Sequence, residues 1–346
     1  MRNAYILAAC RTPGCKAKKG KLKDVRPDDL AAAAIKGLMV KSGASPSDVE
    51  DIIIGCAFPE GEQGMNFARV AAMKAGMPVE APAQTVNRFC SSGLQAIASA
   101  AERIMAGFAD CIIAGGSESM SMIPIGGARY SANPSLVADW PESFASMGIT
   151  AEIVAEKFGI TRVDQDIFAA ASHAKAAAAI AAGKFRDEII PVEAERCTLL
   201  NGKILRSTEL VDADDGVRGD TTVDGLGKLK TPFKAAGTVT AGNSSQMTDG
   251  AAAVLVVSEE YLKRTGKKAL ARFVAFAVKG VPPEIMGIGP VAAIPAALKL
   301  AGLSLEDIGL FELNEAFAAQ SLACIKELGI DASRVNVNGG AIALGH

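Results

Sequence analysis

Cys90 is the residue in this sequence best suited to covalent chemistry. It lies in residues 85–95 (TVNRFCSSGLQ), where an apolar stretch gives way to polar residues and an Ala-rich segment follows. This pattern predicts a strand, a turn and then a helix from about residue 94 to residue 105. Unpaired N–H groups and the dipole at a helix N-terminus stabilise a thiolate. We therefore expect Cys90 to have a lowered pKa and to act as a nucleophile. A buried structural cysteine is the alternative.

Two further polar groups follow apolar segments near the end of the sequence. Residues 311–317 (FELNEAF) end a predicted strand close to Asn314. Residues 335–346 (VNVNGGAIALGH) form another strand-to-helix passage, and it closes on His346, one of only two histidines. A cysteine, a histidine and an asparagine at such positions could converge in one pocket. That combination is typical of cysteine nucleophilic catalysis, with histidine as the base and asparagine stabilising an oxyanion.

The composition is that of a globular protein and argues against several functional classes. A length of 346 residues suits two similar domains or one large α/β unit. The net charge of −2 gives no general attraction to nucleic acid. We interpret the basic run at residues 16–23 as a solvated loop, with attraction of an anionic substrate as the alternative. No segment reads as an uninterrupted membrane span, and strand-like residues follow Met1 without a cleavable leader.

The seven cysteines follow no disulfide or metal-site spacing. Cys56, Cys111 and Cys324 lie in apolar runs, so we expect them in the core. An odd number of unpaired thiols fits a reducing compartment. These observations predict a cytoplasmic protein without a metal site.

An internal repeat divides the sequence into two α/β halves. Residues 43–54 (GASPSDVEDIII) parallel residues 302–313 (GLSLEDIGLFEL): each copy has a glycine helix end, a Ser-x-x-Asp capping box and a buried strand. Residues 86–87 correspond in the same way to residues 335–336. Two such halves packed face to face would bring the helix N-termini near Cys90 and His346 together. Between them lies a loop-rich segment with one long helix at about 164–182, capped from residue 161.

Five runs together closely resemble the thiolase family. They are residues 87–95, 115–121 (GGSESMS), 237–253, 314–317 and 338–346. The resemblance implies the thiolase fold, an α/β fold of two similar halves packed as a layered α-β-α-β-α core with an inserted loop domain. It places the N-terminal half at 1–120 plus about 235–268, the CoA-binding loop insertion at 121–234, and an incomplete C-terminal half at 269–346.

The resemblance also implies an activity. Residues 88–92 (RFCSS), 243–246 (NSSQ) and 286–290 (MGIGP) are similar to the degradative 3-ketoacyl-CoA type, an acetyl-CoA C-acyltransferase of fatty-acid β-oxidation. An acetoacetyl-CoA thiolase is one alternative, although those members usually have His-Met where this sequence has Ser146-Met147. A non-catalytic CoA-binding or assembly subunit is the other alternative.

The roles that the resemblance implies can be given residue by residue. Cys90 is the nucleophile that carries the acyl group, His346 is the base, and Asn314 holds a water that stabilises an oxyanion. Coenzyme A would contact Met147, Arg218, Ser245 and Phe317. Coenzyme A and acyl-CoA are substrates, so neither a metal nor another cofactor is expected.

Two further expectations come from the family pattern. A second catalytic cysteine, in a Cys-x-Gly-Gly-like strand, has no match here, because the sequence ends at His346. The resemblance therefore implies a C-terminally truncated chain. Family members dimerise through the strand that carries the counterparts of Asn87 and Phe89, so we expect a homodimer or homotetramer.

Two other sequence features, a glycine-rich run and His173, are not expected to have a functional role. Residues 287–292 (GIGPVA) match a dinucleotide fingerprint, but a proline-rich stretch precedes them in place of a strand, and Pro290 suits the first turn of a helix. His173 has no partner nearby in sequence, so we interpret it as a surface histidine on a helix.

Overall fold

The computed structural model describes residues 2–200 and 202–346, with the side chains of residues 196–200 left out. The chain forms two compact units. Unit 1 comprises residues 1–130, 185–215 and 248–274, and unit 2 comprises residues 131–184, 216–247 and 275–346. Each unit is described by itself below, and the domain boundaries expected from the sequence stay a prediction.

Unit 1 contains a seven-stranded sheet with the strand order β4-β3-β5-β8-β1-β9, and β2 pairs with β8. The strands are β1 (Ala4–Arg11), β2 (Cys15–Lys16), β3 (Asp51–Gly55), β4 (Ala83–Val86), β5 (Cys111–Ser119), β8 (Thr248–Ser258) and β9 (Ala271–Arg272). Strand β3 is parallel to β4 and β5, whereas β8 is antiparallel to β5 and β1. The expected α/β class is confirmed.

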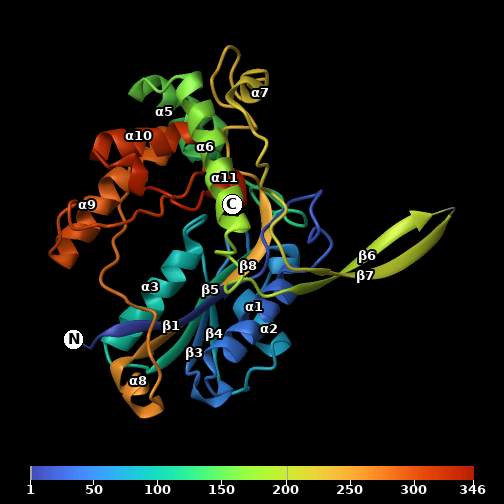
Figure 1. Cartoon of the computed structure of the whole chain (residues 1–346), viewed down its shortest axis with the longest axis vertical. Helices are drawn as coiled ribbons and strands as arrows, with labels where there is room; N and C mark the ends of the chain where they lie inside the picture. Colours follow the sequence, from blue (N-terminus) through green and yellow to red (C-terminus); the bar gives the residue numbers. More distant parts are fainter. Residues whose placement is uncertain (1, 201) are drawn as a thin grey trace. The chain divides into compact units, whose positions relative to one another are not determined.

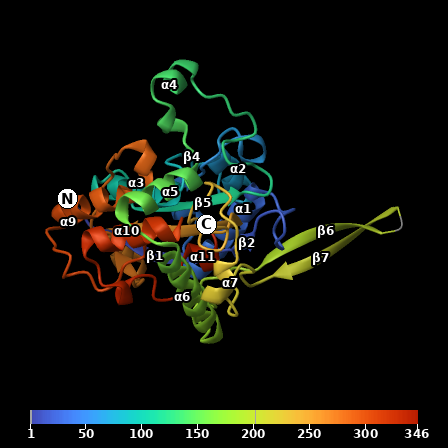
Figure 2. The same ribbon diagram turned by 90° about the horizontal axis from the view of Figure 1, so that it is seen from above.

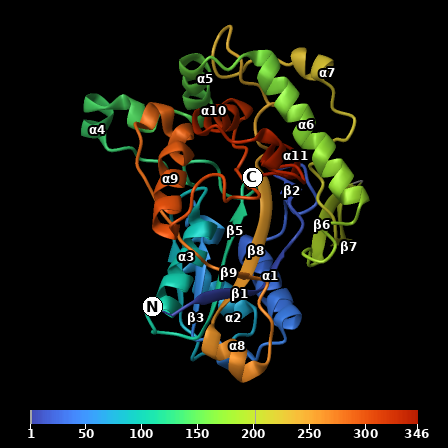
Figure 3. The ribbon, with the colours of Figure 1, turned by 60° about the vertical axis from the view of Figure 1, so that its left-hand side comes forward.

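Alternating side chains of the sheet face two helical layers of unit 1. Ile52 and Ile54 belong to a core with α1 (Pro27–Ser42) and α2 (Phe67–Lys74), whereas Ile53 packs with α3 (Ser92–Met105). Figure 3 shows α3 and α1 on opposite sides of the strands. The β-strand period of two explains this division, because successive residues point to opposite faces. Helix α3 confirms the helix predicted after Cys90.

Three other features complete unit 1. A hairpin of β6 (Val192–Leu200) and β7 (Lys203–Val211) extends away from the sheet of this unit (Figure 1). Helix α8 (Glu259–Thr265) follows β8, and short 3-10 turns lie at Pro46–Asp48 and Gly61–Gln63. The capping box expected from Ser45 to Asp48 does not form, because Asp48 instead accepts a hydrogen bond from the Tyr261 hydroxyl at 3.0 Å.

Unit 2 is mainly helical. Its helices are α4 (Pro134–Asp139), α5 (Met147–Phe158), α6 (Arg162–Ala181), α7 (Val223–Gly227), α9 (Gly289–Ala301), α10 (Ala318–Leu328) and α11 (Ala341–Leu344), with 3-10 turns at Pro141–Phe144, Pro283–Ile288 and Ala332–Arg334. Helices α6, α10 and α11 share one apolar cluster (Figure 2). The capping box of Thr161 and Asp164 begins α6, as the sequence predicted.

The sheet expected in the second half does not form among the residues described for unit 2. Phe311 and Val335 make an isolated parallel bridge in place of a ladder. Before Val335, residues Ala332–Arg334 form a 3-10 turn, and after it Asn336 turns the chain with a left-handed φ of 46° and binds both backbone groups of Leu313. Strand pairing therefore stops after one residue pair.

The residues Pro283–Ala301 form the one helical stretch in the described chain that is long and apolar enough to cross a membrane, with a mean hydropathy of 1.4. This finding differs from the expectation that no segment has that character. The stretch is kinked at Ile285, and its α-helical part, α9, has 13 residues. At 1.5 Å per residue, α9 would be about 20 Å long, short of a hydrocarbon core of about 30 Å.

Candidate active site

The turn that carries Cys90 joins β4 to α3 and is stabilised by its own side chains. Phe89 has a left-handed φ of 44°. Ser92 Oγ accepts a hydrogen bond from the Arg88 N–H at 2.8 Å and donates to the Phe89 carbonyl at 2.6 Å. Asn87 Oδ1 accepts from the Phe89 N–H at 2.8 Å. Helix α3 begins at Ser92, so Cys90 lies at its N-terminus as predicted.

Cys90 is the exposed residue among the six cysteines whose side chains are described, and the other five are buried, although surrounding atoms still desolvate the Cys90 sulfur. Burial raises the pKa of the buried thiols, to about 12 for Cys56 and Cys111. The lowered pKa expected for Cys90 is wrong. Burial of its sulfur by surrounding atoms raises that pKa, its own backbone N–H opposes the rise, and the negative charge of Glu118 adds to it. Desolvation and a like charge thus outweigh the helix N-terminus.

The carboxylate of Glu118 supports the Cys90 turn through the loop of Ala57 and Phe58. Glu118, near the end of β5, accepts hydrogen bonds from the backbone N–H groups of Ala57 at 2.7 Å and Phe58 at 3.3 Å. The Ala57 carbonyl in turn accepts from Asn87 Nδ2 at 3.0 Å, and the Phe58 ring lies 6.1 Å from the Phe89 ring, centroid to centroid. Glu118 therefore holds the loop against which the turn rests.

In unit 2, Asn314 and the chain before His346 line one cavity of about 300 Å³. Its lining residues are Glu312, Leu313, Asn314, Asn336, Gly339, Gly340, Ala341, Leu344 and Gly345. The Asn314 side chain is exposed at this cavity. The structure thus brings Asn314 and Gly345, the residue before His346, to one cavity.

His346 is held by the backbone at the end of α11. Its N–H donates to the Gln246 carbonyl at 2.9 Å, and Gln246 Nε2 donates to the carbonyls of Ile342 and Ala343, both at 3.1 Å. His346 is an exposed residue, but desolvation by the atoms around its ring lowers its pKa. The ring is therefore neutral near pH 7, which is the form that accepts a proton.

Of the four predicted CoA-contacting residues, Phe317 packs on Phe233, and Met147 and Ser245 are chain neighbours of residues close to these two rings. The Ser245 N–H donates to the Ala316 carbonyl at 2.9 Å, and the preceding residue, Ser244, pairs with Phe317. The Phe317 ring meets the Phe233 ring edge to face at 6.4 Å. Helix α5 begins at Met147, and the glycine that follows Met147 packs against the same Phe233 ring.

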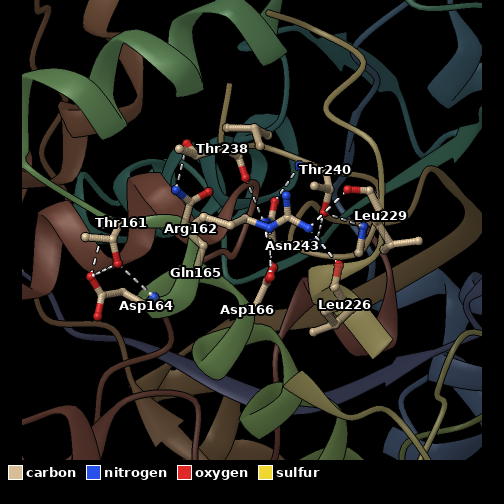
Figure 4. Close-up of polar contacts among 12 residues, drawn as sticks. Thr161, Arg162, Asp164, Gln165, Asp166, Leu226, Leu229, Thr238, Thr240 and Asn243 are labelled. Carbon is tan, nitrogen blue, oxygen red and sulfur yellow. Dashed lines mark hydrogen bonds and ion pairs between the residues drawn. The ribbon is translucent and has the colours of Figure 1, made fainter. Parts of the chain in front are cut away.

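A buried ionic network holds the chain that leads to Ser245 (Figure 4). Arg162 Nε pairs with Asp166 at 2.7 Å, and the same guanidinium donates to the Leu226 carbonyl at 2.6 Å. Asn243 Nδ2 donates to the other Asp166 oxygen at 3.0 Å. Because Asn243 is fully buried, this contact fixes the backbone two residues before Ser245.

Arg218, the fourth predicted CoA contact, lies on an exposed loop, and no hydrogen bond, ion pair or ring contact within the described part of the chain connects it with Phe233. Its backbone N–H donates to His173 Nδ1 at 3.2 Å. The interpretation of His173 as a surface residue is wrong, since it is only 1% exposed. Burial, together with the charge of Arg218, lowers the pKa of His173 to about 4, so a neutral imidazole anchors the Arg218 loop.

Sequence comparison matches the description "Thiolase, N-terminal domain" over residues 4–260 and "Thiolase, C-terminal domain" over residues 267–346. The chain belongs to the thiolase family. It is 55% identical over 347 aligned residues to the 3-ketoacyl-CoA thiolase of Bacillus subtilis, which covers all of this chain and 89% of that protein.

Solved thiolase structures also resemble this chain. Human mitochondrial 3-ketoacyl-CoA thiolase is 39% identical with a TM-score of 0.88, covering 100% of this chain and 88% of that one. The acetyl-CoA acetyltransferase of Bacillus anthracis is 39% identical with a TM-score of 0.90 and the same coverage. The thiolase resemblance and its degradative type are thereby confirmed.

Several features of this thiolase escaped sequence reasoning. Glu118 and Glu315 lie inside recognised runs without an assigned role, and Phe233 is an aromatic residue in a polar loop. No group of three or more His, Cys, Asp or Glu residues among the described ones could hold a metal ion. The meeting of Cys90 with Asn314 and His346 stays a prediction, because they belong to different units.

Proposed function

We propose that this thiolase is a 3-ketoacyl-CoA thiolase, an acetyl-CoA C-acyltransferase that cleaves 3-ketoacyl-CoA with coenzyme A in fatty-acid β-oxidation. The observation that carries the proposal is that Cys90 is the exposed residue among the six described cysteines, in a chain 55% identical to a 3-ketoacyl-CoA thiolase. A nucleophile must be accessible to its substrate, and Cys90 alone of these six cysteines is an exposed residue.

The first half of the proposed reaction acylates Cys90. The thiol transfers its proton to the neutral imidazole of His346, and the thiolate attacks the keto carbon of the substrate. The raised pKa of Cys90 makes such a base necessary, because little thiolate exists at pH 7 without one. The bond between C2 and C3 then breaks, its electron pair goes to C2, and that carbon takes a proton from solvent water, which releases acetyl-CoA.

The second half transfers the acyl group. A second coenzyme A loses its thiol proton to solvent water, and its thiolate attacks the Cys90 thioester. The shortened acyl-CoA forms as the Cys90 thiolate leaves and takes back the proton held by His346. A water held by Asn314, together with His346, stabilises one developing oxyanion, and the Cys90 N–H stabilises the other. Coenzyme A is a substrate in both steps, and we propose no metal or other cofactor.

We also propose that the pantetheine arm lies along Met147, Ser245 and Phe317, and that Arg218 binds the nucleotide. The packing of Phe317 on Phe233 supports the first part, because it offers apolar surface close in the fold to the segment that carries Ser245. The Arg218 guanidinium forms no ion pair with the described residues, so it is available to a phosphate.

An acetoacetyl-CoA thiolase is the second candidate, favoured by the similarity to the Bacillus anthracis acetyl-CoA acetyltransferase. Substrate length separates the two candidates. A 3-ketoacyl-CoA thiolase turns over 3-ketooctanoyl-CoA at least as well as acetoacetyl-CoA, and an acetoacetyl-CoA thiolase strongly prefers the four-carbon substrate.

The proposal is tested by turnover and by trapping. Purified protein is mixed with 3-ketooctanoyl-CoA and coenzyme A, acetyl-CoA is quantified, and the acyl-enzyme is mapped by mass spectrometry. We expect Cys90→Ala to lose at least about 1,000-fold in rate and the acyl adduct. Cys10→Ala, which alters a buried thiol on β1, is the matched control and should retain activity. An active Cys90→Ala variant, or an adduct on another cysteine, would refute the proposal.

Oligomeric state and location are further proposals. We propose a homodimer or homotetramer that assembles through β4, because β4 is a short edge strand and Phe89 beside it is 65% exposed. Light scattering after size exclusion should give at least twice the mass of one chain. A cytoplasmic location rests on the cysteine pattern of the sequence, and cell fractionation tests it.

A further inference from the structure

Glu315 is a buried carboxylate that the proposed reaction does not use. It follows Asn314 directly and is 1% exposed, and it has no ion pair with any residue in the described part of the chain. A carboxylate in such a place is costly unless hydrogen bonds satisfy its oxygens. The identity of its donors therefore shows what Glu315 holds in place.

Three donors reach Glu315, and each comes from a different part of unit 2. Ser172 Oγ on α6 donates to Oε2 at 2.6 Å. Asn336 Nδ2 donates to Oε1 at 2.9 Å. The Ile342 N–H, in the first turn of α11, donates to Oε2 at 3.2 Å. These bonds join the residue after Asn314 to α6, to the turn after Val335 and to the start of α11.

Two of the donors extend the network around the cavity. Ser172 Oγ also accepts the Gly340 N–H at 3.1 Å, which fixes the turn just before α11. Asn336 binds both the N–H and the carbonyl of Leu313 at 2.8 Å, one residue before Asn314. Gly340 itself packs so closely on the Glu315 carboxylate that a Cβ there would overlap it.

The same network determines where His346 lies. Helix α11 has four residues, too few to be stable alone. Glu315 holds its first turn, and Gln246 holds its last residues and the N–H of His346. We propose that Glu315 is a positioning residue that sets Asn314 and the end of α11, from which His346 extends, around the same cavity. This inference rests on the proposed function.

The test compares Glu315→Gln with Glu327→Gln, an exposed and unpaired glutamate on α10 that serves as the control. Glutamine keeps the shape of glutamate but replaces one acceptor oxygen with an NH₂ group, so at least one donor is left opposite another donor. We expect kcat for 3-ketooctanoyl-CoA thiolysis to fall at least tenfold while KM changes less than threefold, because substrate-binding residues are not touched.

A second readout does not depend on activity. The chain has two histidines, so ¹³Cε1-histidine labelling gives two NMR signals, and a His173→Gln variant identifies the one from His346. We expect Glu315→Gln to shift or broaden the His346 signal and Glu327→Gln to leave it unchanged. An unchanged kcat or an unchanged His346 signal in Glu315→Gln would overturn the inference.

A second variant and the NMR readout decide the question if Glu315→Gln does not fold or if the wild-type chain is inactive. If Glu315→Gln does not fold, Ser172→Ala removes one donor and the acceptor of Gly340, and a smaller loss of kcat with a shifted His346 signal is expected. If the wild-type chain itself releases no acetyl-CoA, the proposed function fails, and the NMR comparison still decides whether Glu315 positions His346.

Discussion

Two turns of this thiolase look alike in sequence and differ in how they are held. Residues 87–91 precede α3 in unit 1, and residues 336–340 precede α11 in unit 2. Each begins with an asparagine, and each contains a left-handed residue, Phe89 with φ 44° and Asn336 with φ 46°. Asn87 is exposed, whereas Asn336 is 2% exposed and binds Leu313 and Glu315.

The supporting carboxylates differ in the same way. Glu118 reaches the first turn indirectly, through the loop of Ala57 and Phe58. Glu315 contacts the second turn and α11 directly. The reason is helix length: α3 has 14 residues and is stabilised by its own packing, whereas α11 has four and depends on side-chain hydrogen bonds. The turn that carries Cys90 is thus supported through a neighbouring loop. The turn before the short helix α11 is instead hydrogen-bonded directly by a buried carboxylate.

The largest difference is expected from a matched pair of glycine substitutions. In Gly340→Ala the new methyl group would overlap the Glu315 carboxylate, so we expect a loss of about 3 kcal/mol in unfolding free energy. In Gly93→Ala the nearest atom lies 3.9 Å away, and we expect no loss, or a gain of up to about 1 kcal/mol from helix propensity. Guanidinium unfolding followed by circular dichroism measures both. Equal effects would contradict the comparison.

The two asparagines should rank in the same order. Asn336→Ala removes three hydrogen bonds and leaves the backbone groups of Leu313 without partners, at a cost of about 2–3 kcal/mol. Asn87→Ala removes two bonds at an exposed site, where water replaces the lost partners, and should cost less than about 1 kcal/mol. The same unfolding assay decides, and a larger cost at Asn87 would reverse our interpretation.

Glu118→Gln tests the electrostatic side of the comparison. Removing the negative charge favours the Cys90 thiolate, so the pKa of Cys90 should fall and alkylation by iodoacetamide at pH 7 should become faster. The rate is measured from pH 6 to pH 10, and its midpoint should move to lower pH. Glu102→Gln, at an exposed position of α3, is the control and should leave the profile unchanged. A midpoint that stays in place or rises would show that Glu118 does not influence the thiol.

Phe89→Gly should have the smallest effect on stability. Glycine relieves the left-handed strain at this position, but the ring contact with Phe58 is lost. The two terms oppose each other, so we expect a net change within about 1 kcal/mol by the same unfolding assay. A loss well above that value would mean that the Phe58 contact stabilises the first turn more than its geometry suggests.

Local patterns were sufficient for much of the fold. The helix after Cys90, the capped start of α6 and the core cysteines follow from capping residues and apolar periodicity, which act between near neighbours. The sequence-based predictions were wrong where residues distant in sequence compete for the same hydrogen-bonding groups. The Ser45 cap is not formed because Tyr261 takes Asp48, and the second-half strands give way to the Asn336 turn.

The sequence by itself determined the family and the identities of the candidate catalytic residues, because those depend on residue types at fixed spacing. Only the tertiary structure decided their electrostatics and support. The pKa of Cys90 is raised because burial and Glu118 act through space, and His173 is buried because α6 packs against the Arg218 loop. Glu315 gains its place from three donors at sequence distances of 21 to 143 residues. No local pattern encodes such contacts, since they exist only after the chain has folded.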